Sequence, residues 1–120
     1  MRKRIGYWKE SIFDPLPEPQ RMVVHGWDPA ERTKVADYLR TKGDPCDASY
    51  GYAHCRFECG ITDEEMGCRD LSDGIYVWPE GFAHYVEKHN VQPPDEFIAY
   101  VLRGGSATST RQRASTRLKP

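Results

Sequence analysis

Apolar residues recur at helical spacing in two stretches of the chain, residues 29–42 and 94–103. In both stretches the i, i+3, i+4 pattern predicts a helix with one buried face. The buried faces consist of Val35, Tyr38, Leu39, Phe97, Ile98, Val101 and Leu102. Asp28 is a favourable N-cap for the first helix, and Asp95 suits the positive N-terminal end of the second. We expect both helices to serve as scaffold.

The middle of the chain carries a strand–strand–helix pattern. Residues 50–59 alternate well enough to predict a strand, and residues 75–78 are β-branched and aromatic, as is typical of a second strand. Asp73-Gly74 is a strong turn signal before that strand. Residues 79–89 then predict a helix that begins at a proline. The expected fold is a small zinc-stabilised α+β domain, in which a ββα zinc-finger-like element is flanked by the two scaffold helices.

The two ends of the chain differ in composition from the middle. Residues 1–4 carry three basic side chains, and residues 104–120 carry four basic side chains with a single large aliphatic residue. A segment so poor in apolar residues buries too little surface to fold alone. Residues 14–20 contain three prolines and are expected to form an extended surface strap. The predicted organisation is a basic N-terminus over 1–4, one domain over 5–103 and a disordered basic tail over 104–120.

Composition and charge limit the classes of function. The chain has 120 residues, of which 38% are hydrophobic and 29% charged, the size of one small domain. No apolar run approaches the roughly 18 residues of a membrane span, and the N-terminus lacks the apolar stretch of a secretory signal, so we expect a cytoplasmic protein. Seven of the 17 basic residues lie at the two ends, so residues 5–103 contain 10 basic and 18 acidic residues. The body therefore carries a formal charge of −8, which disfavours binding to double-stranded nucleic acid.

Two pairs of metal-ligand residues lie on the ββα element. Cys55 and Cys59 are separated by three residues before a glycine turn, and His84 and His89 by four residues on the predicted helix. These separations fall within those of zinc sites built from two cysteines and two histidines. The sequence therefore predicts a structural zinc ion held by these four side chains. The alternatives are two disulfides, or no metal at all, with each residue in an ordinary buried or polar role.

One spacing departs from the zinc-finger pattern. Between Cys59 and His84 lie 24 residues, about twice the usual twelve. Positions five apart on a regular helix also differ by about 140° around the axis, so both histidines can share one ion only if the helix tightens or frays near His89. If the helix stays regular, Cys68 is the alternative fourth ligand, in a site of three cysteines and one histidine. Two further residues are expected to lie outside the site, Cys46 and His54.

The segments that carry these ligands resemble a set of small bacterial proteins without a known activity. The similar segments are Asp70-Leu-Ser-Asp-Gly-Ile-Tyr-Val-Trp-Pro-Glu-Gly-Phe-Ala-His-Tyr-Val-Glu-Lys-His89 and Cys55-Arg-Phe-Glu-Cys59. That set has a Cys-Arg knuckle and a Leu-Thr-Asp-Gly…Trp-Pro-Glu-Gly-Leu-x-His-Tyr-Val…His motif. The resemblance covers about residues 5–102 and implies a shared fold, with no function attached.

The function expected from these observations is a non-catalytic interaction module whose partner is a protein or a larger assembly. Structural zinc sites use four protein ligands and leave no open position for a substrate. One alternative is contact with nucleic acid through the basic tails, chiefly residues 104–120. The other is a small zinc-dependent hydrolase with Glu80, Glu58 or Asp73 as general base, although no hydrolase motif is present. The sequence does not indicate an oligomeric state.

Overall fold

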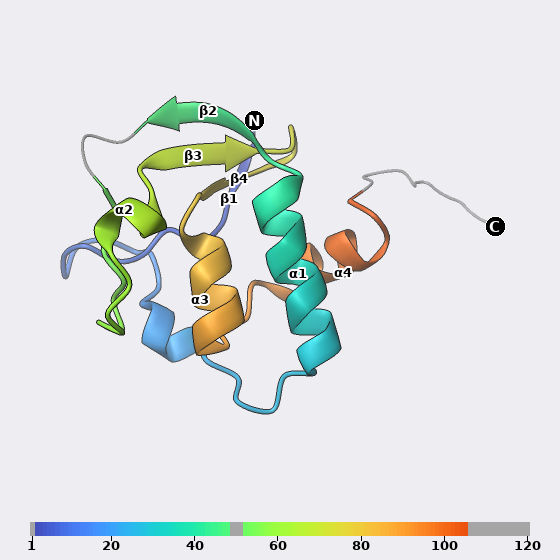
Figure 1. Ribbon diagram of the computed structural model, residues 1–120, viewed down its shortest axis with the longest axis horizontal. Coiled ribbons are helices and arrows are strands. Elements are labelled where there is room, and N and C mark those ends of the chain that lie inside the picture. The colour runs from blue at the N-terminus through green and yellow to red at the C-terminus, as the bar shows by residue number, and fades with distance from the viewer. Residues whose placement is uncertain (1, 49–51, 106–120) are drawn as a thin grey trace.

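The computed structural model describes residues 2–48 and 52–105. Its elements are β1 (Lys3–Arg4), the 3-10 helix η1 (Pro19–Met22), α1 (Pro29–Thr41), β2 (Asp44–Ala48), α2 (Asp63–Met66), β3 (Arg69–Ser72), β4 (Tyr76–Pro79), α3 (Phe82–His89) and α4 (Asp95–Leu102). The fold is α+β, as the sequence predicted (Figure 1). None of the helices in the described part of the chain is long and apolar enough to span a bilayer.

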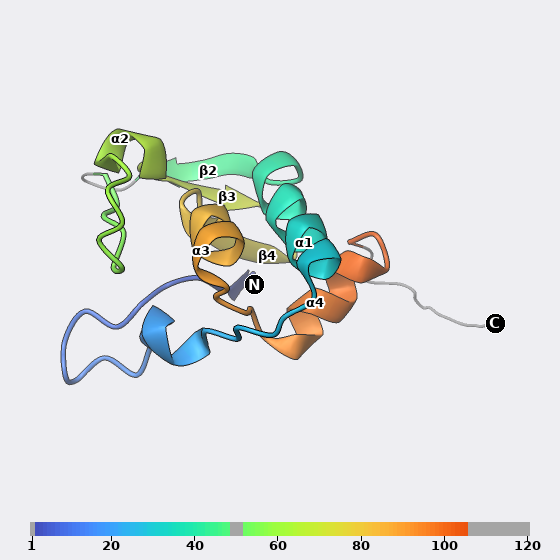
Figure 2. The ribbon, with the colours of Figure 1, turned by 60° about the horizontal axis from the view of Figure 1, so that its bottom comes forward.

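The strands form one mixed sheet in the order β1-β4-β3-β2. The β3–β4 hairpin is antiparallel, with Leu71 opposite Trp78, and β2 pairs antiparallel with β3. β1 pairs parallel with β4, a contact that the sequence did not predict. α1 packs against α3 and α4, and the three helices lie on one side of the sheet (Figures 1 and 2).

The core between sheet and helices is aromatic. Trp78 of β4 and Phe97 of α4 are fully buried, with ring centroids 6.2 Å apart. The Trp78 indole N–H donates to the Leu39 carbonyl of α1 at 3.1 Å, so this large ring leaves no unpaired donor in the core. On α3, Phe82 and Val86 face the same core and are at most 1% exposed. These two side chains fix which face of α3 is buried, and they therefore also fix the directions in which its other side chains point.

Asp73, at the β3–β4 turn, joins the hairpin to two helices. Its carboxylate accepts the hydroxyls of Tyr38 (α1) at 2.6 Å and Tyr100 (α4) at 2.9 Å. It also accepts the backbone N–H groups of Ile75 and Tyr76 at 2.9 and 2.8 Å. Burial alone would raise the pKa of this carboxyl, but these donors outweigh it and hold the pKa below its ordinary value.

The predicted helices are observed with small changes at their ends. The helices expected over 29–42, 79–89 and 94–103 are α1, α3 and α4. As predicted, Asp28 caps α1, accepting the Glu31 backbone N–H at 3.1 Å. α3 begins at Phe82, later than expected, because Pro79 still belongs to β4 and pairs with Asp70.

The strand predicted over residues 50–59 is wrong. Residues 52–59 form a loop, and the first strand of the hairpin is β3 instead. The chain turns back at Glu58, whose φ of 50° is incompatible with a strand. Residues 49–51 lie outside the described residues. β1, β2 and β3 were not predicted from the sequence. β2 contains Pro45 and is an edge strand with a register shift between Pro45 and Asp47.

The surface strap predicted over residues 14–20 is only partly extended. From Pro19 the chain forms the 3-10 helix η1, and the Pro19 side chain is buried. Most of the tail predicted as disordered over 104–120 lies outside the described residues, which end at Gly105.

Candidate metal centre

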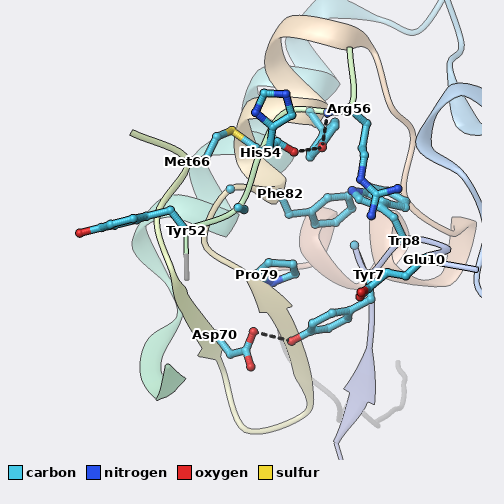
Figure 3. A pocket seen from close by; sticks show the side chains of 14 residues that line it. Tyr7, Trp8, Glu10, Tyr52, His54, Arg56, Met66, Asp70, Pro79 and Phe82 are labelled. Atoms are coloured by element: carbon cyan, nitrogen blue, oxygen red, sulfur yellow. Dashed lines mark hydrogen bonds between the residues drawn. The ribbon is translucent and has the colours of Figure 1, made fainter. Parts of the chain in front are cut away.

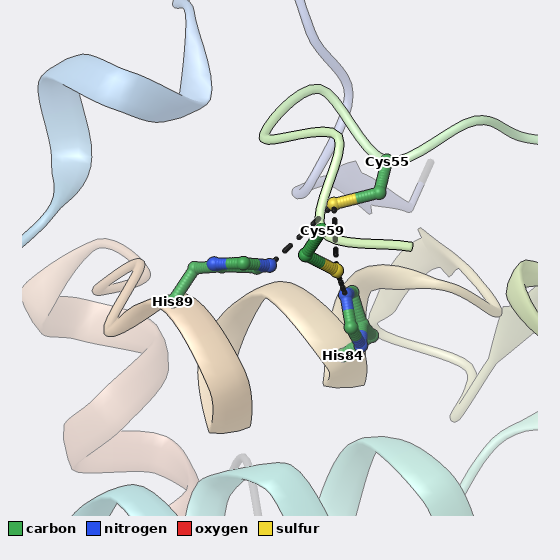
Figure 4. Close-up of side chains that lie close together, drawn as sticks. All are labelled: Cys55, Cys59, His84 and His89. Atoms are coloured by element: carbon green, nitrogen blue, oxygen red, sulfur yellow. Dashed lines mark hydrogen bonds between the residues drawn. The ribbon is translucent and has the colours of Figure 1, made fainter. Parts of the chain in front are cut away.

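Cys55, Cys59, His84 and His89 converge on one point, where a metal ion could bind (Figure 4). One donor atom from each side chain lies within 4.8 Å of the other three. The two Sγ atoms are 3.9 Å apart. Each sulfur also faces the Nε2 atom of one histidine, Cys55 that of His89 at 3.5 Å and Cys59 that of His84 at 3.3 Å.

These distances match the edges of a zinc tetrahedron. Ligand distances of about 2.3 Å to sulfur and about 2.05 Å to nitrogen place two sulfurs about 3.8 Å apart and a sulfur and a nitrogen about 3.6 Å apart. The observed separations of 3.9, 3.5 and 3.3 Å are within a few tenths of an ångström of these values. A disulfide needs sulfurs about 2.05 Å apart, and both cysteines are free thiols.

The loop over residues 52–62, directly before α2, supplies both sulfurs. The Glu58 backbone N–H donates to the Cys55 carbonyl at 3.0 Å, which closes a tight turn between the two cysteines. Gly60 follows with a φ of 94°, a conformation that glycine adopts without strain. Burial raises the pKa of the Cys55 thiol, and the backbone N–H groups of Phe57 and Cys59 oppose that shift. Such N–H donors stabilise a thiolate and fix its direction, as outer-shell groups of metal sites do.

α3 supplies both histidines, His84 from its first turn and His89 as its last residue. On a regular helix His84 and His89 would point about 140° apart. Here the Asn90 N–H bonds to the Tyr85 carbonyl, an i to i−5 contact that widens the last turn, and Asn90 itself has a φ of 55°. The helix thus ends at His89, and the two imidazole centroids lie 5.0 Å apart. From the sequence, both histidines could share one ion only if the helix tightened or frayed near His89; the structure instead has a widened turn there.

Two aromatic side chains that sequence reasoning left out of the site hold its two halves together. Phe57 of the loop stacks on His89, with centroids 4.3 Å apart and planes 9° from parallel. The Tyr85 hydroxyl on α3 accepts the Arg56 backbone N–H at 2.8 Å and donates to the His54 carbonyl at 3.3 Å. The sequence signal for the Tyr85 contact was the position of this tyrosine between the two candidate histidines on the predicted helix.

The electrostatics of the four groups suit a bound cation. Burial lowers the pKa of His84 and of His89, which favours the neutral imidazole that a metal requires. Burial raises the pKa of Cys55, which is 1% exposed, and the backbone donors offset this only in part. A cation supplies the positive charge that a buried thiolate needs. Cys59, in contrast, is exposed, so the site opens to solvent on one side.

The other candidates lie apart from this cluster. Cys68, the alternative ligand, is not among the four converging side chains; its backbone N–H bonds to the Glu80 carboxylate at 3.0 Å. Cys46 is a free thiol, as expected, but it lies on β2 and donates to the Asp70 carbonyl at 3.5 Å. His54 contacts Asp63 at 3.0 Å.

The fold and the site define a small α+β domain with a potential metal centre of two cysteines and two histidines. The model of one protein family, the domain of unknown function DUF7919, matches residues 18–102. The chain belongs to this family. All four converging side chains lie within the matched range. No curated protein and no solved structure matches the chain.

Proposed function

We propose that Cys55, Cys59, His84 and His89 bind one zinc ion and that this ion is structural. The observation that carries the proposal is the convergence of the four donor atoms within 4.8 Å, with one sulfur–sulfur and two sulfur–nitrogen distances close to those of a zinc tetrahedron. Two sulfurs and two nitrogens are a typical donor set of structural zinc sites, and four protein donors leave no position for a substrate. The ion would link the cysteine-bearing loop to α3, and that link would stabilise the fold.

The contacts of two of the three candidate general bases, Glu80 and Asp73, support a structural site over a hydrolytic one. Glu80, one candidate general base, accepts the backbone N–H groups of Cys68 and Arg69 at 3.0 and 3.1 Å. Asp73, another candidate, is occupied by the two tyrosine hydroxyls and two backbone donors described above. Both carboxylates thus stabilise the hairpin. A general base needs a free carboxylate within reach of the reacting proton.

We further propose that the domain is a non-catalytic interaction module whose partner is a protein. A loop over residues 9–17 supports this, because it presents Ile12 and Phe13 at 83% and 89% exposure. The loop is closed by a hydrogen bond from the Lys9 N–H to the Pro17 carbonyl at 2.8 Å. Asp14 accepts the Leu16 backbone N–H at 2.9 Å inside it. Two adjacent large apolar side chains held outward in this way are typical of a contact surface.

The zinc proposal is tested by metal analysis of the purified chain and of its cysteine variants. We expect one zinc per chain in the wild type, and cobalt(II) substitution should give the visible spectrum of a tetrahedral thiolate site. Cys55→Ser and Cys59→Ser should lose the metal, whereas the matched variants Cys46→Ser and Cys68→Ser should keep it. A wild-type chain without metal, or loss of metal from Cys68→Ser alone, would contradict the ligand set.

The partner proposal is tested by cross-linked capture from cell extract with quantification of the bound proteins. A specific partner should be depleted by the double variant Ile12→Ser/Phe13→Ser and retained by Leu102→Ser. Leu102 was predicted to lie on the buried face of its helix, but it is exposed at the end of α4. Removal of residues 106–120 tests the alternative, which is contact with nucleic acid through the basic tail. If the bound material is nucleic acid that is lost with those residues and at high salt, contact occurs through the basic tail and the protein-partner proposal is wrong.

A further inference from the structure

A pocket lies beside the metal centre, between the segment that follows β1, the cysteine-bearing loop and the start of α3 (Figure 3). Its volume of about 430 Å³ falls within the range of small-molecule sites. The aromatic side chains in its lining are Tyr7, Trp8, Tyr52, Phe82 and Tyr85. Trp8 packs edge-on against Phe82 and Tyr85 at 5.7 and 5.3 Å, so this wall is fixed by core contacts. The pocket is therefore a preformed, largely aromatic recess.

The acceptor groups of the pocket are carboxylates. The Tyr7 hydroxyl donates to Oδ1 of Asp70 at 2.9 Å, and the two side chains face each other in Figure 3. Burial and the neighbouring Asp70 raise the pKa of Tyr7, so it remains a protonated donor. This bond uses one of the two Asp70 oxygens. Glu10 brings a second carboxylate to the lining.

The two basic side chains of the lining, Arg56 and His54, each have a partner within the described residues. Arg56 donates through Nη1 to the Lys9 carbonyl at 2.9 Å. The His54 ring contacts Asp63 at 3.0 Å. A ligand would thus meet acceptors with spare capacity, Asp70 and Glu10, and donors that are partly occupied. The faces of the aromatic rings carry negative electrostatic potential as well, and the Tyr7 ring already has the Arg4 guanidinium 4.3 Å from its centroid.

We propose that this pocket binds a small organic cation, a protonated amine carried on a flat apolar body. The ammonium group donates to Asp70, the Glu10 carboxylate adds negative charge to the lining, and the apolar body packs against Trp8 and Phe82. The proposal goes beyond the structural zinc site, because the metal ligands are absent from the lining; it rests on the proposed zinc only in that the cysteine-bearing loop forms part of the pocket wall.

The test is a titration of the isotope-labelled full chain, with its metal content measured in parallel, followed by amide and indole NMR signals. Three probes of similar size separate charge from shape: 2-phenylethylamine (cation), 2-phenylethanol (neutral) and phenylacetate (anion). The cation should shift the Trp8 indole and the Phe82 and Ala53 amides with a dissociation constant of the order of millimolar. The neutral probe should bind about fivefold more weakly, and the anion more weakly still.

Two variants test whether Asp70 recognises the positive charge of the ligand. Asp70→Asn keeps an oxygen acceptor for Tyr7 but removes the charge, so it should weaken binding of the cation about fivefold and leave the neutral probe unchanged. Asp37→Asn makes the same charge change on α1, outside the lining, and should have no effect. Three results would each overturn the proposal: tightest binding of phenylacetate, equal losses in the two variants, or no shift of lining residues with any probe at roughly ten times the expected dissociation constant.

Discussion

Removal of the proposed zinc ion should destabilise the domain severely. Structural zinc in small domains binds with an apparent free energy of about 10–16 kcal/mol. A value of about 12 kcal/mol corresponds to a dissociation constant of about 1 nM, and at about 10 µM free zinc the bound ion then stabilises the folded state by about 5.5 kcal/mol. Domains of this size are stable by about 5–15 kcal/mol in total. Chelation should therefore lower the melting temperature by roughly 20–40 °C.

The loop should lose its structure before the core does. The Arg56 amide is held by the Tyr85 hydroxyl in a loop that is attached to the rest of the domain by side-chain contacts and by the four-ligand cluster, whereas Trp78 and Phe97 pack against each other in the core. The assay is thermal unfolding with and without chelator, combined with hydrogen exchange of the Arg56 and Trp78 amides and with zinc analysis of each sample. A metal-depleted chain that melts within about 2 °C of the loaded chain would refute the linkage between this site and folding.

Three further changes test contacts around the site and the core. Tyr85→Phe removes the hydroxyl that holds the Arg56 amide and should lower the free energy of unfolding by about 1–3 kcal/mol, measured by urea titration; an unchanged midpoint would contradict this role. Asp73→Asn should cost about 1–3 kcal/mol at pH 7. Because the pKa of Asp73 is below its ordinary 3.8 in the folded state, its contribution is present above that pH and is lost as the pH falls below it. The wild-type and variant unfolding curves should therefore converge in acid, and a constant gap would contradict the assignment. Gly6→Ala should be destabilising in a thermal melt, since Gly6 has a φ of 76° and a Cβ there would lie 2.5 Å from the Phe82 ring; an unchanged melting temperature would show that the N-terminal segment does not pack as described.

Local signals were sufficient for α1, α3 and α4 and for the convergence of the four side chains, whereas the short helices η1 and α2 were not predicted. Asp28 and the apolar spacing around Val35 define α1 without tertiary information. The paired spacings of cysteines and histidines were equally local. What the sequence could not supply was the backbone path between the pairs, because that path depends on long-range contacts.

The misassigned segments show this dependence. The alternation over residues 50–59 resembles a strand, yet its side chains are divided between the metal centre, the pocket and α3. Cys68 remained a candidate ligand because nothing in the sequence indicates that Glu80 holds its amide. At β2, in contrast, a strand is present that the sequence did not predict. Pro45 is compatible with this strand because it lies at the edge of the sheet.

The two outer strands of the sheet also restrict how another chain can attach. On one side β2 carries Pro45, which has no N–H to donate, and its register shift twists the edge away from a regular ladder. On the other side β1 is only two residues long. Neither edge offers the continuous row of donors and acceptors that an added strand needs. A protein that binds this domain must therefore recognise side chains, and backbone-mediated extension of the sheet into a larger assembly is disfavoured.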